Sequence, residues 1–148
     1  MPMIHDVTTD PDDPPPFVAL HAARLACKNG ADYSGLNAAA HRQRYPDILP
    51  ATFKQAPPKV YQSAFATCKN LGWAIEAAVE SEGRIEATAT TRILRFKDDV
   101  VIRIRPTLDG ARLDIRSASR LGRSDLGANA RRIRTFLQEL NSCLKTNT

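Results

Sequence analysis

The segment at residues 116–129 holds the residue types best suited to chemistry, because arginines, serines and an aspartate are interleaved there with glycines. An arginine side chain presents a planar fork of N–H donors that matches carboxylate and phosphate oxygens. A helix that begins after this segment adds free backbone N–H groups and a partial positive charge at its first turn. The pattern therefore indicates a site for a phosphate, sulfate or carboxylate group. The candidate anion-binding residues are Arg103, Arg105, Arg112, Arg116, Arg120 and Arg123.

The same segment also has a structural interpretation, which we favour. Gly122 permits a tight turn, and the side chains of Ser124 and Asp125 can cap the following helix. Asp125 can also pair with a neighbouring arginine and lock the last strand to the last helix. Turn glycines and caps occur at most strand–helix joints, so they need no ligand to explain them. The candidate residues of this structural lock are Gly122, Ser124, Asp125 and Asn129.

Other acidic, histidine and cysteine residues form no catalytic or metal-binding motif in the sequence. Asp98 and Asp99 are predicted at a hairpin tip, and neighbouring residues on a strand point to opposite faces, which prevents joint acid–base action. The aspartates of residues 6–13 resemble a calcium loop only loosely, because three prolines at 14–16 replace its flexible turn. The histidines and cysteines match no zinc-ligand spacing. We therefore predict no catalytic residue, no metal and no cofactor.

The charge distribution points to an anionic partner or to an internal one. The net charge is +5, yet residues 1–13 carry four aspartates and no basic residue, whereas residues 84–134 carry thirteen basic and six acidic side chains. Either the basic part faces an anionic ligand or an acidic protein surface, or the acidic segment folds back onto it. Nucleic acid is disfavoured, because Phe96 is the one aromatic residue between Trp73 and Phe136, so the rings on which bases stack are missing.

The elements that must position these residues fall into two parts of different composition. Nine of the ten prolines occur at or before Pro58, so residues 1–56 are predicted to be an irregular arm, with a helix at about 17–28, that packs on the core through its aromatic residues. Residues 57–148 are predicted to hold a helix at about 57–71, four strands with alternating apolar and polar residues, and a final helix from about Ala130 to Leu144.

Short links between the predicted strands favour antiparallel neighbours. The predicted class is therefore α+β, with two layers in the order helix, four-stranded antiparallel sheet, helix, and with the proline-rich arm packed on this core. Because 148 residues suit one domain, we expect residues 1–148 to form a single domain. No apolar run approaches the ~20 residues of a membrane-spanning helix, and no signal peptide is visible, so the sequence by itself predicts a cytoplasmic protein.

Several blocks over nearly the whole chain match a known pattern. They are IHDVTTD at residues 4–10, YPD at 45–47, GRIEAT at 83–88, FKDDVVIR at 96–103, and DIRS, SR, SDLG and RRIR within residues 114–134. On these residues the chain resembles the bacterial and plastid family catalogued as domain of unknown function 1499. The family name implies that no activity is assigned. In some relatives the domain looks to follow membrane-spanning segments, and this implies a place at the cell envelope.

Three classes of function follow from these observations. The leading expectation is a non-enzymatic binding or interaction module with an arginine-lined surface for an anionic ligand. The first alternative is an enzyme in which Arg116 and Arg120 hold an anionic substrate and Asp99 or Asp125 acts as the base. The second alternative is a purely structural accessory domain. A pocket on the arginine face favours the first two classes, and a flat face with all its charges paired favours the third.

Overall fold

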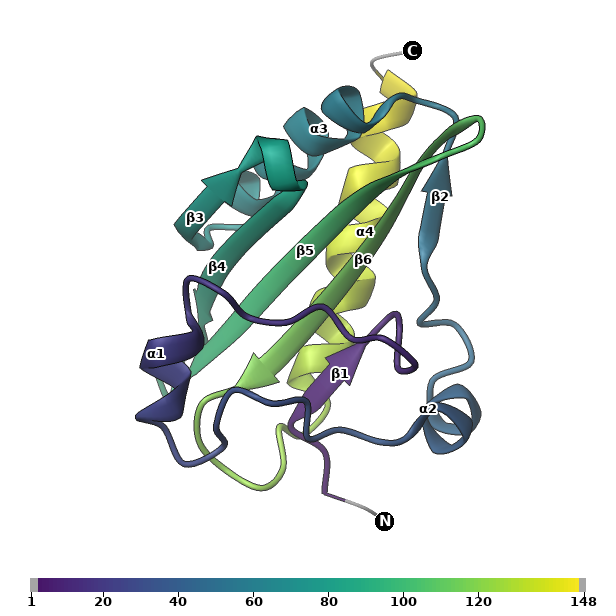
Figure 1. The fold of residues 1–148 in the computed structure, drawn as a ribbon. Coiled ribbons are helices and arrows are strands. Elements are labelled where there is room, and N and C mark those ends of the chain that lie inside the picture. The colour runs from purple at the N-terminus through teal and green to yellow at the C-terminus, as the bar shows by residue number, and fades with distance from the viewer. Residues whose placement is uncertain (1–2, 147–148) are drawn as a thin grey trace.

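An antiparallel sheet of six strands forms the centre of the computed structural model, which describes residues 3–146 (Figure 1). The strands are β1 (Asp6–Thr8), β2 (Ala51–Phe53), β3 (Ala74–Val79), β4 (Arg84–Thr90), β5 (Lys97–Thr107) and β6 (Gly110–Ser119). The helices are α1 (His21–Leu25), α2 (Ala38–Arg44), α3 (Pro57–Asn70), α4 (Ala128–Thr146) and the short 3-10 helix η1 (Glu80–Glu82). The sheet order is β1-β6-β5-β4-β3, and β2 pairs with β6 on the same edge as β1.

The predicted four-stranded sheet flanked by two helices is wrong, because the residues before Pro57 add two strands and two helices. The four expected strands are present as β3 to β6. β1 and β2 have three residues each, and they pair with residues 116–118 and 111–113 of β6. A strand this short shows no alternation, and it is held by a partner strand far along the chain, so its own sequence does not reveal it. The antiparallel α+β character of the prediction is retained.

Helices α3 and α4 cover one face of the sheet and enclose the main core. α3 begins at Pro57, where the missing N–H costs no helical hydrogen bond. It ends before Gly72, whose φ of +80° suits glycine. Strand residues such as Ile85 and Ile102 are fully buried against these helices. The buried core residues of α4 are Ala130, Ile133, Phe136, Leu140 and Leu144.

The arm covers the other face of the sheet, which the sequence predicted to be its polar face. Figure 1 shows the chain after β1, together with α1, passing in front of β4, β5 and β6 on the side opposite α4. Phe17 and Leu20 of this segment form a second small core with Val101 and Ala118 of the sheet. The helix expected over residues 17–28 is reduced to the five residues of α1. Both faces of the central strands are therefore buried.

The β4–β5 connection also differs from its prediction. The loop is formed by residues 91–96, and β5 already begins at Lys97. Asp98 and Asp99 consequently lie inside the sheet, opposite Ala89 and Thr88, and not at a hairpin tip. The alternation of apolar and polar residues in the sequence of β4 continues to Ile93 and predicts a longer strand, but β4 ends at Thr90 and Ile93 is 91% exposed in the loop. The sheet does not extend into this segment because Thr91 closes the loop on itself through hydrogen bonds with the backbone of Arg95 and Phe96.

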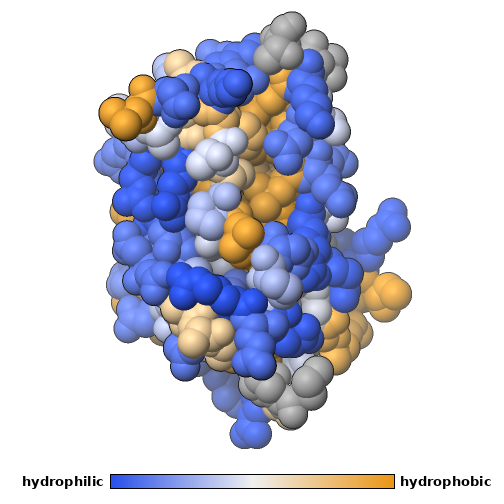
Figure 2. Space-filling model, turned by 90° about the vertical axis from the view of Figure 1, so that its right-hand side faces the viewer, coloured by the Kyte–Doolittle hydropathy of each residue, from blue (hydrophilic) through white to orange (hydrophobic). Residues whose placement is uncertain are grey.

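The core is partly open on the side where β2 borders the sheet. Figure 2 shows hydrophobic surface there in a hollow between hydrophilic margins. β2 contributes Ala51 and Phe53, both partly buried against the core, to this edge. Gly110 of β6 lies so close to β2 that an added Cβ would meet the Phe53 carbonyl oxygen at 1.8 Å. A side chain at this position would therefore displace β2.

Buried His41 of α2 should make stability depend on pH. Its Nε2 accepts a hydrogen bond from the Thr8 backbone N–H at 3.3 Å, and burial lowers the pKa of the imidazole below about 6.5. Because the unfolded chain then binds the proton more readily, the free energy of unfolding should be highest above pH ~6.5 and fall as the pH drops. Urea denaturation across this range measures the slope. His41→Gln should flatten it, and exposed His21→Gln should not; an unchanged slope in His41→Gln would contradict the account.

Candidate functional site

Carboxylates of the arm approach the arginines at one end of the covered sheet face. Asp10 Oδ2 accepts hydrogen bonds from Arg103 at 3.1 Å and from Arg112 at 3.0 Å. Arg105 also lies 3.9 Å from Asp10, so the Asp10 carboxylate is the acidic partner of three arginines. Asp114 of β6 accepts a 2.8 Å hydrogen bond from Arg112 Nε. These three candidate anion-binding residues thus have acidic partners inside the protein.

Arg116 forms one of the two most buried ion pairs of this face, and Arg24–Asp99 is the other. Its Nε and one terminal nitrogen donate to the two carboxylate oxygens of Asp6 at 3.0 and 2.9 Å. Its remaining donors reach the carbonyl oxygens of Pro15 and Ala31, and the ring of Phe17 lies 4.5 Å from the guanidinium carbon. Only 2% of the Arg116 side chain and none of the Asp6 side chain is exposed. An external anion cannot reach this guanidinium group without displacing the arm.

Two buried carboxylates of the sheet, Asp99 and Glu86, accept hydrogen bonds from α1 and from the residues just before it. Asp99 accepts hydrogen bonds from Arg24 at 3.0 Å and from both Nε and a terminal nitrogen of Arg120 at 2.9 Å. The hydrogen bond to Asp99 raises the pKa of Arg120, which keeps it charged. Glu86 pairs with Arg84 and accepts the backbone N–H groups of residues 18–20. The pairing of this face extends over β4, β5 and β6.

Arg123 differs from the other five candidate arginines. It is exposed in the loop of residues 120–127, which joins β6 to α4. Within residues 3–146 it forms no ion pair, whereas Arg103, Arg105, Arg112, Arg116 and Arg120 each do. The structure therefore separates the predicted anion-binding residues into five arginines that have acidic partners within the protein and one, Arg123, that has none within residues 3–146.

The four predicted residues of the structural lock lie together at the start of α4. Asp125 Oδ1 accepts the Gly127 N–H at 2.7 Å, and Oδ2 accepts the Asn129 N–H at 3.2 Å. Ser124 Oγ accepts the Leu126 N–H at 3.3 Å, and Gly122 has a φ of +90°. The Asn129 side chain donates to Ser119 Oγ of β6 at 2.9 Å. These contacts tie the helix start to the last strand, and no arginine pairs with Asp125.

Loss of the Asp125 carboxylate should destabilise the protein. Asp125→Ala removes acceptors from the backbone N–H groups at the helix start and is expected to lower the free energy of unfolding by about 1–2 kcal/mol. Asp125→Asn should cost less, because an asparagine side chain still accepts a hydrogen bond at this position. Chemical denaturation of both variants measures the difference. An Asp125→Ala protein as stable as the parent would show that the carboxylate is not a cap.

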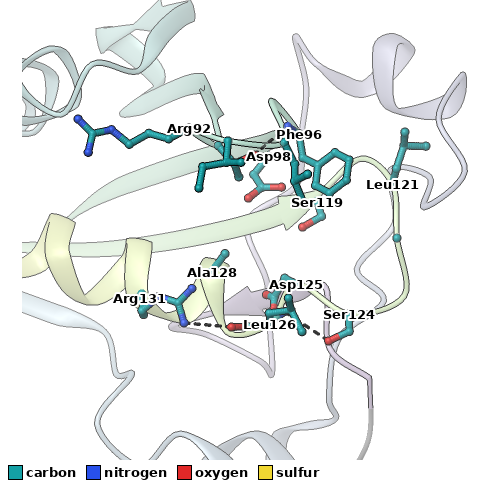
Figure 3. A pocket seen from close by; sticks show the side chains of 14 residues that line it. Arg92, Phe96, Asp98, Ser119, Leu121, Ser124, Asp125, Leu126, Ala128 and Arg131 are labelled. Atoms are coloured by element: carbon teal, nitrogen blue, oxygen red, sulfur yellow. Dashed lines mark hydrogen bonds between the residues drawn. The ribbon is translucent and has the colours of Figure 1, made fainter.

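A pocket of about 370 Å³ opens at the end of the sheet where β5 begins and β6 ends. It lies between the 91–96 loop and the 120–127 loop, and we call it the loop pocket. Figure 3 shows Phe96 and Asp98 on one side of it and Leu126 and Ala128 on the other. Its walls are mainly apolar. The apolar side chains that line it are Ile93, Leu94, Phe96, Leu121, Leu126 and Ala128.

The polar groups beside the loop pocket are engaged with one another. Asp98, which is buried, lies 2.8 Å from Arg132 of α4. Asn129 Oδ1 accepts hydrogen bonds from Ser117 Oγ at 2.6 Å and from Arg132 at 2.9 Å. This network fixes the pocket between strand and helix.

Arginines without acidic partners gather around this pocket. Ten of the fifteen arginines form ion pairs. Arg92 and Arg131 line the loop pocket, and Arg131 also donates to the Leu126 carbonyl oxygen at 3.0 Å. Arg95 and Arg123 lie in the two loops outside the pocket lining. The arginines that form no ion pair within residues 3–146 are Arg44, Arg92, Arg95, Arg123 and Arg131.

Sequence reasoning missed the loop pocket. Its apolar residues are split between two loops 25 or more residues apart in the chain, for example Phe96 and Leu121. Ile93 was assigned to a strand, because Thr91 and Ile93 continue the alternation of β4. The adjacent pair Ile93-Leu94 was the one signal available, since two neighbouring apolar residues break a period of two.

Metal ligands, reactive thiols and membrane-spanning helices are three further features to consider in the described residues. Within residues 3–146 no group of three or more histidine, cysteine or acidic side chains is placed to hold a metal ion. Burial raises the pKa of the Cys68 thiol to about 12, which keeps it protonated and unreactive. None of the helices in this range is long and apolar enough to cross a bilayer.

A model of a protein family matches most of the chain. A family model described as "Protein of unknown function (DUF1499)" matches residues 6–140, which include all six strands and most of α4. No curated protein matches the chain. The matched region contains both loops of the pocket and the arm residues that pair with the sheet.

Proposed function

The chain belongs to the DUF1499 family, a family of unknown function, and on that premise we propose that it is a non-enzymatic binding module for an anionic amphiphile. The apolar part of the ligand occupies the loop pocket. Its anionic group lies at the mouth, next to Arg131, whereas the Arg92 side chain extends away from the pocket (Figure 3). Association with the cell envelope stays a prediction from the family resemblance.

The observation that carries this proposal is the combination of an apolar pocket with unpaired cations. A volume of about 370 Å³ falls in the range of small-molecule sites, which are mostly apolar with a few polar groups that fix orientation. Arg92 and Arg131 provide charge without a carboxylate partner within residues 3–146. An anionic group therefore gains an ion pair there without breaking one.

This proposal places the anion beside the loop pocket and not on the predicted arginine-lined face of the sheet. Arg123 lies outside the pocket lining, and we propose that it faces anionic groups beyond the pocket and does not contact the pocket ligand. The guanidinium groups of the other five candidates are matched by Asp6, Asp10, Asp99 or Asp114, so an external anion would have to compete with an internal carboxylate. We propose that these five stabilise the fold of the arm on the sheet.

One alternative keeps support from a specific observation. The arginine face is covered and its charges are paired, which favours a purely structural accessory domain. That alternative assigns no role to the loop pocket. The enzyme alternative loses its candidate bases, because Asp99 is occupied by Arg24 and Arg120 and Asp125 by backbone N–H groups.

Titration with dodecyl phosphate below its critical micelle concentration tests the proposal by calorimetry. The parent protein should bind with one molecule per chain. Leu121→Asp places a like charge in the pocket and should weaken binding about tenfold or more, since like-charge contacts are strongly unfavourable at an interface. Arg131→Gln should weaken it about fivefold, as expected for one exposed ion pair.

Leu108→Asp is the matched control, because Leu108 is fully exposed at the opposite end of the β5–β6 hairpin. This variant should bind dodecyl phosphate as the parent does. No binding by the parent, or equal losses in Leu121→Asp and Leu108→Asp, would reject the loop pocket as a ligand site and favour the structural alternative.

A further inference from the structure

We propose that the end of the molecule formed by the 91–96 and 120–127 loops docks on an anionic lipid membrane. The apolar side chains at the loop tips enter the headgroup region, and the cations beside them contact lipid phosphates. This docking uses the same end of the molecule as the loop pocket. It does not require a ligand in the pocket, so it can be tested independently of the proposed function.

The loop tips expose an unusual amount of apolar side chain. Ten large hydrophobic side chains are exposed within residues 3–146, and half of them lie in these two loops. Ile93 is 91% exposed and Leu126 is 83% exposed, so they project from the surface in addition to bordering the pocket. Leu94, Phe96 and Leu121 are each more than half exposed. Gathered apolar side chains of this kind mark an interaction site.

Cations alternate with these apolar residues. Arg95 lies between Leu94 and Phe96, and Arg123 lies between Leu121 and Leu126. Neither forms an ion pair within the described part of the chain, and neither lines the loop pocket. The two loops together hold one acidic residue, Asp125, whose oxygens are engaged by backbone N–H groups. The surface is thus complementary in charge to anionic headgroups.

The backbone holds both tips in shape. Arg95 and Leu126 have φ values of +58° and +52°, and they are the non-glycine residues with positive φ within residues 3–146. The 91–96 loop is closed by hydrogen bonds from the Thr91 N–H to the Phe96 carbonyl and from the Phe96 N–H to Thr91 Oγ, both 2.8 Å. A strained conformation of this kind persists where the surrounding contacts enforce it. In this backbone conformation the side chains of Ile93 and Leu126 at the tips are exposed.

A membrane fits this pattern better than a protein partner does. Protein interfaces bury an apolar centre with few charges and place polar groups at the rim. Here cations and apolar side chains alternate along each loop, as they do in elements that bind the membrane interface through apolar insertion combined with attraction to anionic lipids. The covered arginine face cannot take this role, because its charges are paired within the protein.

Co-sedimentation with lipid vesicles tests the proposal. The parent protein should bind vesicles that contain phosphatidylglycerol, and binding should weaken with added salt. Vesicles of phosphatidylcholine alone should bind it at least tenfold less. Arg95→Gln/Arg123→Gln should lower the partition coefficient about twenty-fivefold, from about fivefold per cation near an anionic surface. Ile93→Ser/Leu94→Ser should lower it about tenfold.

A matched control combines one apolar and one cationic change at the opposite end of the molecule. Lys54 is exposed and lies beside Gly110 in the region of the β5–β6 hairpin, near Leu108. Leu108→Ser/Lys54→Gln should leave vesicle binding unchanged. Binding that is equal on neutral and anionic vesicles, no binding to either, or a loss in the control equal to that in the loop variants would overturn the proposal.

Dodecyl phosphate separates this proposal from the proposed function. Arg95 and Arg123 do not line the loop pocket, so Arg95→Gln/Arg123→Gln should bind dodecyl phosphate as the parent does while losing vesicle binding. Loss of vesicle binding with intact ligand binding supports docking. Vesicle binding that survives in this variant rejects docking whether or not the pocket binds a ligand.

Discussion

Replacing Asp6 with alanine is expected to lower the free energy of unfolding by about 3–5 kcal/mol, because it leaves the buried guanidinium group of Arg116 without its counter-charge. The two side chains are joined by two hydrogen bonds of 3.0 and 2.9 Å in a setting that excludes solvent. The pair also links β1 to β6 at a sequence separation of 110 residues. Urea denaturation measures the change.

A double variant and an exposed pair serve as controls for this prediction. Asp6→Ala/Arg116→Met removes both charges and should be more stable than Asp6→Ala, because no unpaired charge stays buried. Asp47→Ala breaks the ion pair between Asp47 and Arg134, two side chains that are each about half exposed. This variant should lower the free energy of unfolding by less than ~1 kcal/mol. Equal costs for Asp6→Ala and Asp47→Ala would show that the buried pair does not hold β1 in place.

Deleting residues 1–56 is expected to abolish cooperative unfolding. The deletion removes β1 and β2 from the edge of β6, and it exposes Val101 and Ala118. It also strips carboxylate or backbone partners from buried charges such as Arg116 and Glu86. On these grounds we propose that residues 1–148 form one folding unit.

Thermal unfolding followed by circular dichroism measures the effect of this deletion. Phe17→Ala gives a graded version, since loss of a buried phenylalanine ring costs about 3–5 kcal/mol. Val18→Ala, at a neighbouring exposed side chain, is the control and should change little. A truncated protein with the midpoint of the parent would show that the arm is dispensable for folding.

The regular half of the fold could be predicted from the sequence, and the arm could not. Apolar residues recur with a regular period in α3, α4 and the strands β3 to β6, and this period indicates which residues of each element face the core. β1 and β2 are three residues long and depend on the edge of β6, so no local pattern reveals them. The opposite charges of arm and core were visible in the sequence. Which aspartate meets which arginine depends on contacts such as Asp6–Arg116, and spacing along the chain does not encode them.

The residues at the start of α4 illustrate what local chemistry reveals about the site. A glycine, a serine and an aspartate before an apolar helical stripe signal a turn and a cap, and Gly122, Ser124 and Asp125 lie at such a turn. Local sequence chemistry does not reveal the loop pocket. It arises where two loops meet at the end of the sheet, and the side chain of Ile93 looks like a strand residue until the loop that carries it is placed.

We propose that the ligand site is the loop pocket and not the arginine face of the sheet. Perturbation of backbone amide resonances by dodecyl phosphate, measured by nuclear magnetic resonance on the whole chain, tests it most directly. We expect the largest shifts in residues 91–96 and 120–128, with the amides of Arg103, Arg105 and Arg112 unchanged. Shifts centred on those three arginines, with both loops unaffected, would contradict it.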